Sequence, residues 1–389
     1  MQTKKLLVTG STFPRWEGDT EPRFILDYAK AMTEYYEVHA LVPMAPGAKE
    51  EEVMEGVTVH RYHYFPIHKW ETLCYPGAIV PRIKEKKIRI FLVPFLLLSL
   101  KAQLKKYAKT VDLVHSHWII PQGIMQASIK TVPYIITGHG GDVTSLNVGP
   151  MKGLKKKTLR NAAATIGVSG YICKKMDELC PGTRATMISM GCDTDKFSPE
   201  NKNDKYFSHD KKNIVFVGRL AEKKGVTYLI EAMKDVDAKL YIIGKGPLED
   251  SLKAQTKELG LEEKITFVGP KSHDELPEIL ASADVFAAPS IVAKDGDQEG
   301  LPVSIMEAMA SGLPVVSGIS GGTSDIVEDG VNGYILDATN VPELADRLRK
   351  IISDDALSKR MSEAALETSK RFSYKSIAAM HYELINSRI

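Results

Sequence analysis

The stretch that decides the fold class is Glu299-Gly300-Leu301-Pro302-Val303-Ser304-Ile305-Met306-Glu307-Ala308-Met309-Ala310-Ser311-Gly312. Pro302 suits the start of a helix, where its missing N–H would have no partner, and Gly312 suits the left-handed position after a helix end. The stretch therefore predicts a helix, with Glu299 before its first turn and Glu307 inside it. Eight residues place the two carboxylates roughly 12 Å apart along the axis.

That separation is too large for the paired acid and base of glycoside hydrolysis, which lie roughly 5–9.5 Å apart. It fits the two ends of one elongated ligand, with the free N–H groups of the helix start between them as an anion site. A nucleoside diphosphate sugar has this layout. The alternative is two unrelated glutamates, one stabilised by the helix dipole and one solvated.

Glu299 and Glu307, with Gly300, Pro302 and the Glu-Ala-Met-Ala continuation, resemble the E-x7-E motif of the family 4 retaining glycosyltransferases. The resemblance covers nearly all of the chain, because further family motifs follow in the same order. It implies the GT-B fold, an α/β architecture of two Rossmann-like domains facing across a cleft. The expected parts are an acceptor-side domain 1–199, a nucleotide-sugar domain 200–372, and a helix 373–389 that packs back on the first domain.

Length and composition agree with a two-domain enzyme. A chain of 389 residues is too long for one ordinary core. The net charge of +2 argues against nucleic acid as the main partner, and the four cysteines lack CxxC spacing, which is typical of reduced cytosolic thiols. No signal peptide is expected at the N-terminus. We therefore expect a cytoplasmic protein, and peripheral attachment at the inner face of the membrane is the alternative that stays open.

The first half alternates apolar runs of strand length with helical patterns, which predicts parallel βαβ units whose ligands bind at the carboxyl ends of strands. The loop 11–20 follows the first strand. The family carries a glycine-rich loop here that closes over the donor phosphates, but this sequence has only Gly18, with Asp19 in the second place. The resemblance implies a donor contact at Gly18, and an ordinary strand–helix connection is the alternative.

Residues 88–100 form the most apolar run of the chain and are flanked by lysines and arginines. Thirteen residues are too few to span a bilayer, which needs roughly 20. Burial in the first domain is the favoured interpretation. Docking on an anionic membrane surface, where lipid-linked acceptors would be found, is compatible with it.

Histidines mark two strand ends of the first half. His115 and His117 share one strand face but lack a third ligand at metal spacing, so we interpret them as structural or cleft-lining residues. His139 follows the next strand between glycines. By resemblance to the family's H-G-x-D segment it lies beside the donor sugar, and Asp142 is an acceptor-side or supporting contact.

The second half begins after a segment that resembles the family's interdomain motif, residues 191–199, and a polar linker, residues 200–212. Arg219 and Lys224 then match the family's G-R-x-x-x-x-K-G motif, whose two cations hold the donor diphosphate. Two cations at a strand end suit this ligand chemically. Because Lys223 precedes Lys224, the sequence leaves open which lysine reaches the ligand.

Further donor contacts are implied by resemblance. Gly244 is expected in a turn near the nucleotide, and backbone groups of Lys271 and Ser272 are expected at the base. The N–H groups of Gly300, Leu301 and Val303 would face the diphosphate. Pro302 has no N–H group to donate, and it is expected at the donor as part of the same turn. Asp295 and Asp297 superficially match the DxD metal motif of a different fold, but their loop setting argues against a metal. Residues 331–336 read as a hairpin-like strand, and 341–371 as one amphipathic helical segment.

The predicted activity is transfer of a sugar with retained configuration from a nucleoside diphosphate sugar, UDP-sugar favoured and GDP-sugar second. The acceptor would be a sugar, a lipid-linked or a small molecule in polysaccharide or glycoconjugate biosynthesis. Neither cofactor nor metal is expected, and no side chain is a convincing covalent nucleophile. The expected catalytic residues are His139, Glu299, Arg219 and Lys224. The alternatives are a GT-B-like epimerase or phosphorylase and a non-catalytic sugar-nucleotide-binding protein.

Overall fold

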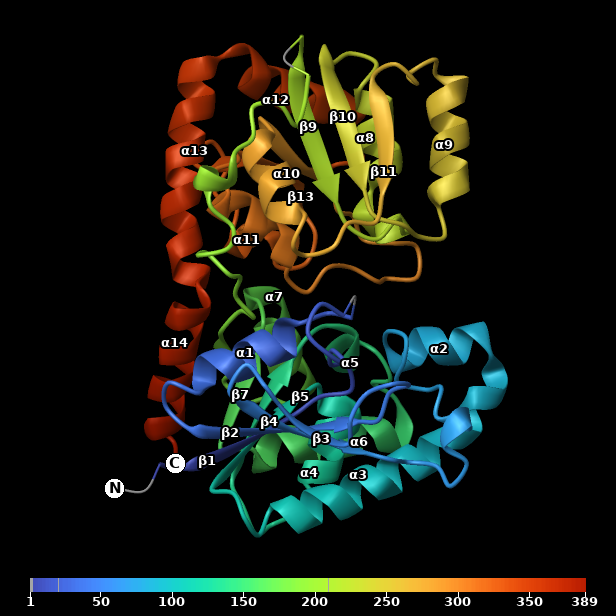
Figure 1. Ribbon diagram of the computed structural model, residues 1–389, viewed down its shortest axis with the longest axis vertical. Coiled ribbons are helices and arrows are strands. Elements are labelled where there is room, and N and C mark those ends of the chain that lie inside the picture. The colour runs from blue at the N-terminus through green and yellow to red at the C-terminus, as the bar shows by residue number, and fades with distance from the viewer. Residues whose placement is uncertain (1–2, 20, 209) are drawn as a thin grey trace. The chain divides into compact units, whose positions relative to one another are not determined.

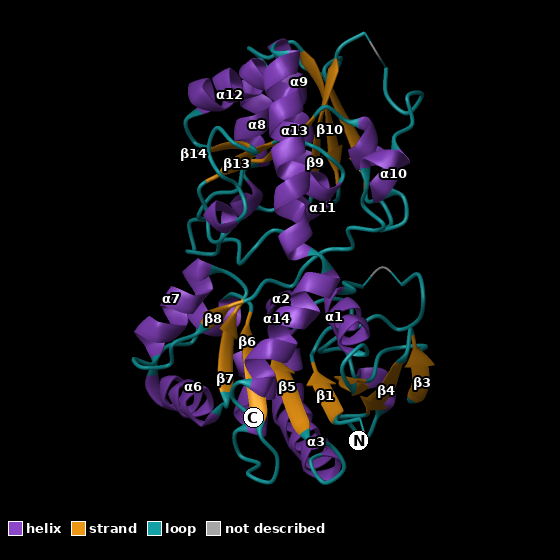
Figure 2. Cartoon of the chain, turned by 90° about the vertical axis from the view of Figure 1, so that its left-hand side faces the viewer, coloured by secondary structure: helices purple, strands orange, loops and turns teal. Residues whose placement is uncertain are grey.

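The computed structural model describes residues 3–19, 21–208 and 210–389. Thr20 of the expected phosphate loop and His209 of the expected linker lie outside this range, as do Met1 and Gln2. The chain divides into two units, one formed by Met1–Met190 with Ile377–Ile389 and the other by Gly191–Ser376. Figure 1 labels most of their elements, and Figure 2 shows the helices packed around each sheet.

The first unit is built on an eight-stranded sheet of order β3-β4-β2-β1-β5-β6-β7-β8. Its strands are parallel except β3, which runs antiparallel to β4 at the edge. Strands that are covered on both faces have continuous apolar sequences, and this is why the first strand, β1, could be predicted from the sequence. The strands are β1 (Lys5–Thr9), β2 (Glu37–Pro43), β3 (Glu51–Met54), β4 (Val57–Tyr62), β5 (Leu113–His117), β6 (Tyr134–Gly138), β7 (Ala164–Gly167) and β8 (Thr186–Met187).

Helices connect the strands of this unit, and the last helix of the chain joins them. They are α1 (Phe24–Met32), α2 (Ile79–Glu85), α3 (Val93–Tyr107), α4 (Ile124–Gln126), α5 (Gly141–Thr144), α6 (Gly149–Asn161), α7 (Gly170–Leu179) and α14 (Tyr374–Asn386). In α14, Tyr382 stacks on Tyr35 with ring centroids 4.3 Å apart, and His381 contacts Tyr28 at 4.8 Å. The C-terminal residues therefore complete the packing of the first unit.

The second unit contains a six-stranded sheet of order β11-β10-β9-β12-β13-β14, the strand order of a doubly wound nucleotide-binding fold. All of its strand pairs are parallel. The strands are β9 (Lys212–Val217), β10 (Ala238–Ile243), β11 (Ile265–Gly269), β12 (Val285–Ala288), β13 (Val315–Gly318) and β14 (Gly333–Leu336). The helices are α8 (Val226–Ala232), α9 (Glu249–Glu258), α10 (Leu276–Ser282), α11 (Val303–Ala310), α12 (Val341–Ser353) and α13 (Asp355–Ser369).

Several expectations about the second half need correction. The unit boundary falls after residue 190 rather than near 200, because Cys192 and Phe197 pack in the core of the second unit. The expected linker also packs there, since Phe207 is buried and its ring lies 4.4 Å from that of Tyr241. Residues 333–336 form no hairpin but pair in parallel with β13.

The expected single segment 341–371 is two helices rather than one. Asp354 interrupts it, because its side chain accepts a hydrogen bond of 2.9 Å from the N–H of Leu357 and caps α13. The break lets α12 and α13 adopt separate directions, with α12 packed on α8 and α13 on α11. The motif helix α11 begins at Val303 and is followed by Gly312 at φ +82°, as the sequence predicted.

Candidate donor site and histidine cluster

The loop that carries Glu299 is held by the turn that follows β13. Gly321 adopts φ +60°, and a Cβ atom there would lie 1.7 Å from the carbonyl oxygen of Glu299. The N–H of Gly321 donates to the Gln298 side chain at 3.1 Å, and the N–H of Gly322 donates to the Gly300 carbonyl at 3.1 Å. No side chain fits at position 321 without moving this backbone, so the turn fixes where Glu299 stands.

The carboxylate of Glu299 contacts both lysines of the loop after β9. It lies 3.3 Å from Lys224 Nζ and 3.7 Å from Lys223 Nζ, and the residue is only 8% exposed. Lys223 also pairs with Asp297 at 3.2 Å and is the more exposed of the two lysines. A buried carboxylate needs such compensation. Lys224 is therefore the lysine committed to Glu299, although the sequence could not choose between them.

Close backbone packing also positions Lys224. The short 3₁₀ helix η5 (Glu222–Lys224) ends at Gly225, where φ is +64° and a Cβ atom would lie 1.9 Å from the Pro289 carbonyl oxygen. The N–H of Ile291 donates to the Lys223 carbonyl at 2.8 Å. The loops after β9 and β12 are thus joined through their backbones. This contact brings the motif lysine to the motif glutamate.

The second motif glutamate, Glu307, lies inside α11 and is 7% exposed. Its carboxylate lies 3.1 Å from Nε2 of His273, which follows β11. Sequence reasoning missed this contact, and the only signal was that His273 follows the loop expected to meet the base. Pro302 at the start of α11 provides no side-chain cap, which keeps the first-turn N–H groups free of a capping side chain.

The other residues expected to bind the donor, Arg219, Gly244, Lys271 and Ser272, make contacts that do not involve Glu299 or Glu307. Arg219 is exposed, and no ion pair of the described residues involves it. Gly244 donates its N–H to the Gly269 carbonyl at 2.9 Å. Lys271 pairs with Glu275 at 2.9 Å, and Ser272 donates both its N–H and its hydroxyl to Glu275. These hydrogen bonds from Lys271 and Ser272 lower the pKa of Glu275 to about 2. The Ser272 N–H expected at the base is therefore engaged within its own loop.

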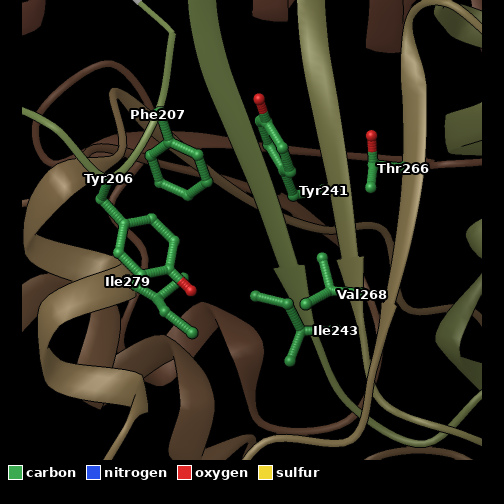
Figure 3. A pocket seen from close by; sticks show the side chains of 7 residues that line it. All are labelled: Tyr206, Phe207, Tyr241, Ile243, Thr266, Val268 and Ile279. Atoms are coloured by element: carbon green, nitrogen blue, oxygen red, sulfur yellow. The ribbon is translucent and has the colours of Figure 1, made fainter.

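A hollow of about 290 Å³ lies on the face of the second unit's sheet, against strands β10 and β11 and beside the loop of Lys271 and Ser272. Figure 3 shows the aromatic rings of Tyr206, Phe207 and Tyr241 around it. Val268 lines its end near the carboxyl edge of the sheet, one residue before Gly269. Ile243, Thr266 and Ile279 complete the lining, so the hollow is mainly apolar and suits a flat or apolar group more than a charged one.

In the first unit, Asp142 shapes the loop that carries His139. Its carboxylate accepts the N–H groups of Ile119 at 2.8 Å, His139 at 3.0 Å and Gly140 at 2.9 Å. Three such bonds fix the backbone of this loop around the carboxylate. Asp142 thus has a supporting role here. Gly18 stands at φ +77° in the loop after β1, with open space where a Cβ would lie.

Buried Lys155 supports the segment that follows Asp142. Its ammonium donates to the carbonyl oxygens of Val143 at 2.8 Å and Ser145 at 2.9 Å. Burial lowers the pKa of Lys155 to about 8. Sequence reasoning passed over this residue, because a lysine in a basic helix such as α6 usually faces solvent.

His139 belongs to a cluster of four histidines. Its Nε2 lies 3.1 Å from Nδ1 of His117, and its ring packs 4.7 Å from that of Trp118. His115 bonds to the Tyr28 hydroxyl at 2.6 Å, and the ring of His381 in α14 lies 4.8 Å from that of Tyr28 and 5.4 Å from that of His115. Burial lowers the pKa of His139 and of His381 to about 4, and it lowers those of His115 and His117 as well.

These low pKa values predict that acid destabilises the first unit. The folded histidines stay neutral down to about pH 4, whereas unfolded histidines titrate near pH 6.5, so the unfolded state binds more protons between these values. The free energy of unfolding should be insensitive to these groups above pH 6.5 and fall as pH drops toward 4, by about 1.4 kcal/mol per pH unit for each histidine.

Urea unfolding followed by tryptophan fluorescence measures this effect selectively, because Trp16, Trp70 and Trp118, the three tryptophans of the chain, all lie in the first unit. His381→Phe keeps a buried ring but removes one titrating group. In the variant, the free energy of unfolding should change less steeply with pH between pH 6.5 and 5, by about 1.4 kcal/mol per pH unit, the contribution of one histidine. An unchanged slope would show that His381 does not titrate as its burial requires.

None of the described residues form a group of three or more His, Cys, Asp or Glu side chains placed to hold a metal ion. Asp295 and Asp297 are exposed, and Asp297 pairs with Lys223. No described helix has both the length and the apolar character needed to cross a bilayer.

Sequence comparisons match both halves of the chain to families of sugar-transferring enzymes. Residues 22–196 match "Glycosyltransferase Family 4", and residues 197–368 match "Glycosyl transferases group 1". An uncharacterized glycosyltransferase of Methanocaldococcus jannaschii is 32% identical over 270 residues, which cover 68% of this chain and 72% of the relative. A GDP-mannose-dependent α-(1-6)-phosphatidylinositol monomannoside mannosyltransferase of Mycolicibacterium smegmatis is 34% identical over 185 residues, 45% of this chain and 48% of that enzyme.

Solved structures agree at the level of the fold. Anabaena HepE, solved in complex with UDP and glucose, superposes with a TM-score of 0.74 over 99% of this chain and all of its own. The sequence identity is 20%. The agreement extends over both Rossmann-like units.

Proposed function

This chain belongs to the family 4, group 1 glycosyltransferases of the GT-B fold, and we propose that it transfers a sugar from a nucleoside diphosphate sugar with retained anomeric configuration. The observation that carries the proposal is the contact of Lys224 with Glu299 beside the start of α11. A fixed cation, a buried carboxylate and a helix N-terminus meet at the carboxyl ends of parallel strands. Ligands bind there in doubly wound folds.

The proposed chemistry follows from this arrangement. The bond between sugar C1 and the phosphate oxygen breaks, the acceptor oxygen bonds to C1 on the same face, and the acceptor's proton passes to the leaving phosphate. Lys224, Arg219 and the N–H groups at the start of α11 would stabilise the charge that gathers on the leaving diphosphate. Glu299 would interact with the positive charge that develops on the sugar ring. His139 is proposed to lie beside the donor sugar, and Asp142 is proposed for the acceptor side through the loop it supports.

UDP-sugar is the favoured donor and GDP-sugar the second. The HepE structure contains UDP, and the mycobacterial relative depends on GDP-mannose, so both stay in the test. A panel of UDP-, GDP- and ADP-sugars screened by thermal shift should pick out one base, because ligand at 100 times its Kd adds about 2.7 kcal/mol of stability. Transfer of radiolabel from that donor to an acceptor supports the proposal. If the sugar nucleotide stabilises the protein but is neither transferred, hydrolysed nor epimerised, the chain is a binding protein. Epimerisation of the sugar would favour an epimerase, and phosphorolysis would favour a phosphorylase.

We predict that transfer survives EDTA. Lys224 and Arg219 supply positive charge where a divalent ion would otherwise neutralise the diphosphate. The rate should stay within about twofold after dialysis against chelator. Loss of activity that Mn²⁺ or Mg²⁺ restores would instead give Asp295 and Asp297 a metal-binding role, and Asp295→Asn with Asp297→Asn would then abolish the rescue.

The acceptor is proposed to be a sugar, a lipid-linked or a small molecule used in polysaccharide or glycolipid biosynthesis. A lipid-linked acceptor would be met at the membrane, and we propose that the protein works in the cytoplasm and at the inner membrane face. The apolar run 88–100 motivates this placement.

A further inference from the structure

Exposed apolar side chains gather in one segment of the first unit. Of the nineteen large hydrophobic side chains that are exposed among the described residues, eight lie between residues 67 and 98. Six of them are used below and are called the apolar surface: Trp70, Ile88, Ile90, Phe91, Phe95 and Leu98. Phe91 and Ile88 are each 69% exposed and Leu98 is 68% exposed. The favoured interpretation, burial of the run in the first unit, therefore holds for only part of its side chains.

Helix α3 explains how the run can be both buried and exposed. Leu96, Leu100 and Leu104 are buried and face the core of the first unit. Successive residues of a helix are rotated by roughly 100°, so Phe95 and Leu98 fall on the side of α3 opposite to these leucines. The helix thus carries two apolar stripes, and a helix that only packs on its own core needs one.

The apolar surface has a rigid frame. The ring of Phe65 lies 4.8 Å from that of Phe95 and 5.8 Å from that of Trp70, which joins α3 to the 3₁₀ helix η1 (His68–Trp70). Buried Arg89 pairs with Glu85 of α2 at 2.8 Å and donates to the Thr72 hydroxyl at 3.2 Å. Figure 1 shows α2 and the first turns of α3 at the outer edge of the first unit.

The charge around this surface has one sign. Residues 67–109 contain ten Lys and Arg but only two Glu, in a chain whose net charge is +2. Exposed lysines stand before and after the run, and no ion pair of the described residues involves them: Lys84, Lys86, Lys87, Lys101 and Lys105. Both glutamates are already paired, Glu85 with arginines and Glu71 with His63. The positive charge is thus available to a negatively charged partner.

We propose that the apolar surface docks on an anionic lipid bilayer, with Ile88, Phe91 and Leu98 in the headgroup region and the flanking lysines at the lipid phosphates. Apolar side chains ringed by cations are the composition of interfacial membrane anchors, and Trp70 suits the boundary between lipid and water. A partner protein of ordinary composition would be expected to bring fewer negative charges. The proposal deepens the proposed function by naming the surface where a lipid-linked acceptor is met, but vesicle binding requires no catalysis.

The test is cosedimentation of the full chain with vesicles of phosphatidylcholine alone or with 30 mol% phosphatidylglycerol, a composition chosen as roughly that of an anionic leaflet. Binding to the anionic vesicles should weaken severalfold when salt rises from about 0.1 M to 0.5 M, since screening shortens the reach of the lysines. Phe91→Gln with Leu98→Gln should reduce the partition coefficient about tenfold or more. Both side chains are exposed, so folding should be unchanged.

Matched controls separate the surface from general stickiness and charge. Val53→Gln with Val148→Gln removes two equally exposed apolar side chains elsewhere in the first unit and should leave binding unchanged. Lys86→Glu with Lys87→Glu should abolish the salt-sensitive part of the binding to anionic vesicles. Lys130→Glu with Lys152→Glu, which changes the charge equally elsewhere in the first unit, should leave that binding in place. Absence of vesicle binding overturns the proposal, and so does binding that the F91Q/L98Q pair leaves intact. A concentration-dependent dimer lost in that pair would assign the surface to a second copy of the chain instead.

A second, independent observation concerns the hydrogen bond between His117 and His139. One of the two nitrogens must donate, and His117 Nε2 decides which, because it is buried with no partner among the described residues. If His139 donated, the proton of His117 would sit on Nε2 as an orphaned buried N–H, which is rare and costly. If His117 donates from Nδ1, only a lone pair of Nε2 stays unpaired.

We infer that His117 is a positioning residue that holds the proton of His139 on Nδ1. His139 is then a neutral hydrogen-bond donor through Nδ1 rather than a base. ¹⁵N-histidine NMR of the full chain near pH 7, assigned with His139→Gln, reads the tautomer directly. The wild type and His117→Asn, whose amide can donate from a similar place, should both show Nδ1–H. His117→Asp, which offers only an acceptor, should move the proton to Nε2. An Nε2–H in the wild type overturns the inference whatever the enzyme's activity.

Discussion

Replacing Glu299 by glutamine should lower kcat by a factor of about 10²–10³, the loss expected if about 3–4 kcal/mol of transition-state stabilisation disappears. The carboxylate is proposed to face the sugar ring as it gains positive charge, so its interaction is stronger in the transition state than with bound donor. It also lies 3.3 Å from Lys224, and glutamine would leave that ammonium without its countercharge. Glutamine keeps the size of the side chain, so the fold should persist.

The companion variant is Glu307→Gln, the other end of the same motif. Glu307 is proposed to accept hydrogen bonds from the ribose, and these are equal in the ground and transition states. The variant should therefore raise the donor KM and leave kcat nearly unchanged. We would measure kcat and donor KM for both variants, with circular dichroism as the folding control. An unaltered kcat in Glu299→Gln, or an unfolded protein, would make Glu299 a structural residue.

Lys224→Gln should reduce kcat/KM by about 10²–10³, through both constants. The diphosphate is negatively charged before the reaction and gains further charge during it, so the lost ammonium weakens donor binding and slows the chemical step. Loss of an ammonium beside a buried carboxylate also leaves Glu299 with Lys223 alone, at 3.7 Å. Donor KM and single-turnover rates separate these contributions.

Lys223→Gln is the matched control for the neighbouring lysine. Its ammonium pairs with exposed Asp297 at 3.2 Å and stands farther from Glu299, so the expected loss is less than about tenfold. Equal losses in the two lysine variants would show that the pair acts as one charged patch. A larger loss in Lys223→Gln would reverse the assignment that the ion-pair distances support.

Local sequence signals were sufficient where a motif and a backbone requirement coincide. Pro302 and Gly312 bracketed α11 because each suits one end of a helix. The alternation of apolar runs with helical patterns predicted the mainly parallel sheet of the first unit. Turn and cap chemistry was harder to read. Asp354 divides the helical segment 341–371 by accepting a hydrogen bond from the N–H of Leu357. Whether this cap forms depends on the direction of the backbone at Asp354, which the sequence pattern does not give. The segment 333–336 resembles a hairpin locally but pairs with β13 because the sheet offers it a free edge.

Contacts between distant segments could not be read from the sequence at all. His273 meets Glu307 across 34 positions, and His381 reaches Tyr28 from the far end of the chain. Lys155 looked like one more solvated cation, yet it is fully buried under the loop after Asp142. The choice between Lys223 and Lys224 likewise depended on Gly225, whose contact with Pro289 only the folded backbone reveals.

The course of α14 has a consequence for how the protein is made. Residues 377–389 belong to the first unit, where Ile377 and Ile385 are buried and Tyr382 stacks on Tyr35. A ribosome therefore synthesises the whole of the second unit before the first unit can complete its packing around Tyr28. Until residues 377–389 are translated, the apolar side chains that α14 covers in the folded first unit stay open to water and to other chains. A nascent chain stalled before residue 377 would hold an incomplete first unit, an exposed target for chaperones and proteases.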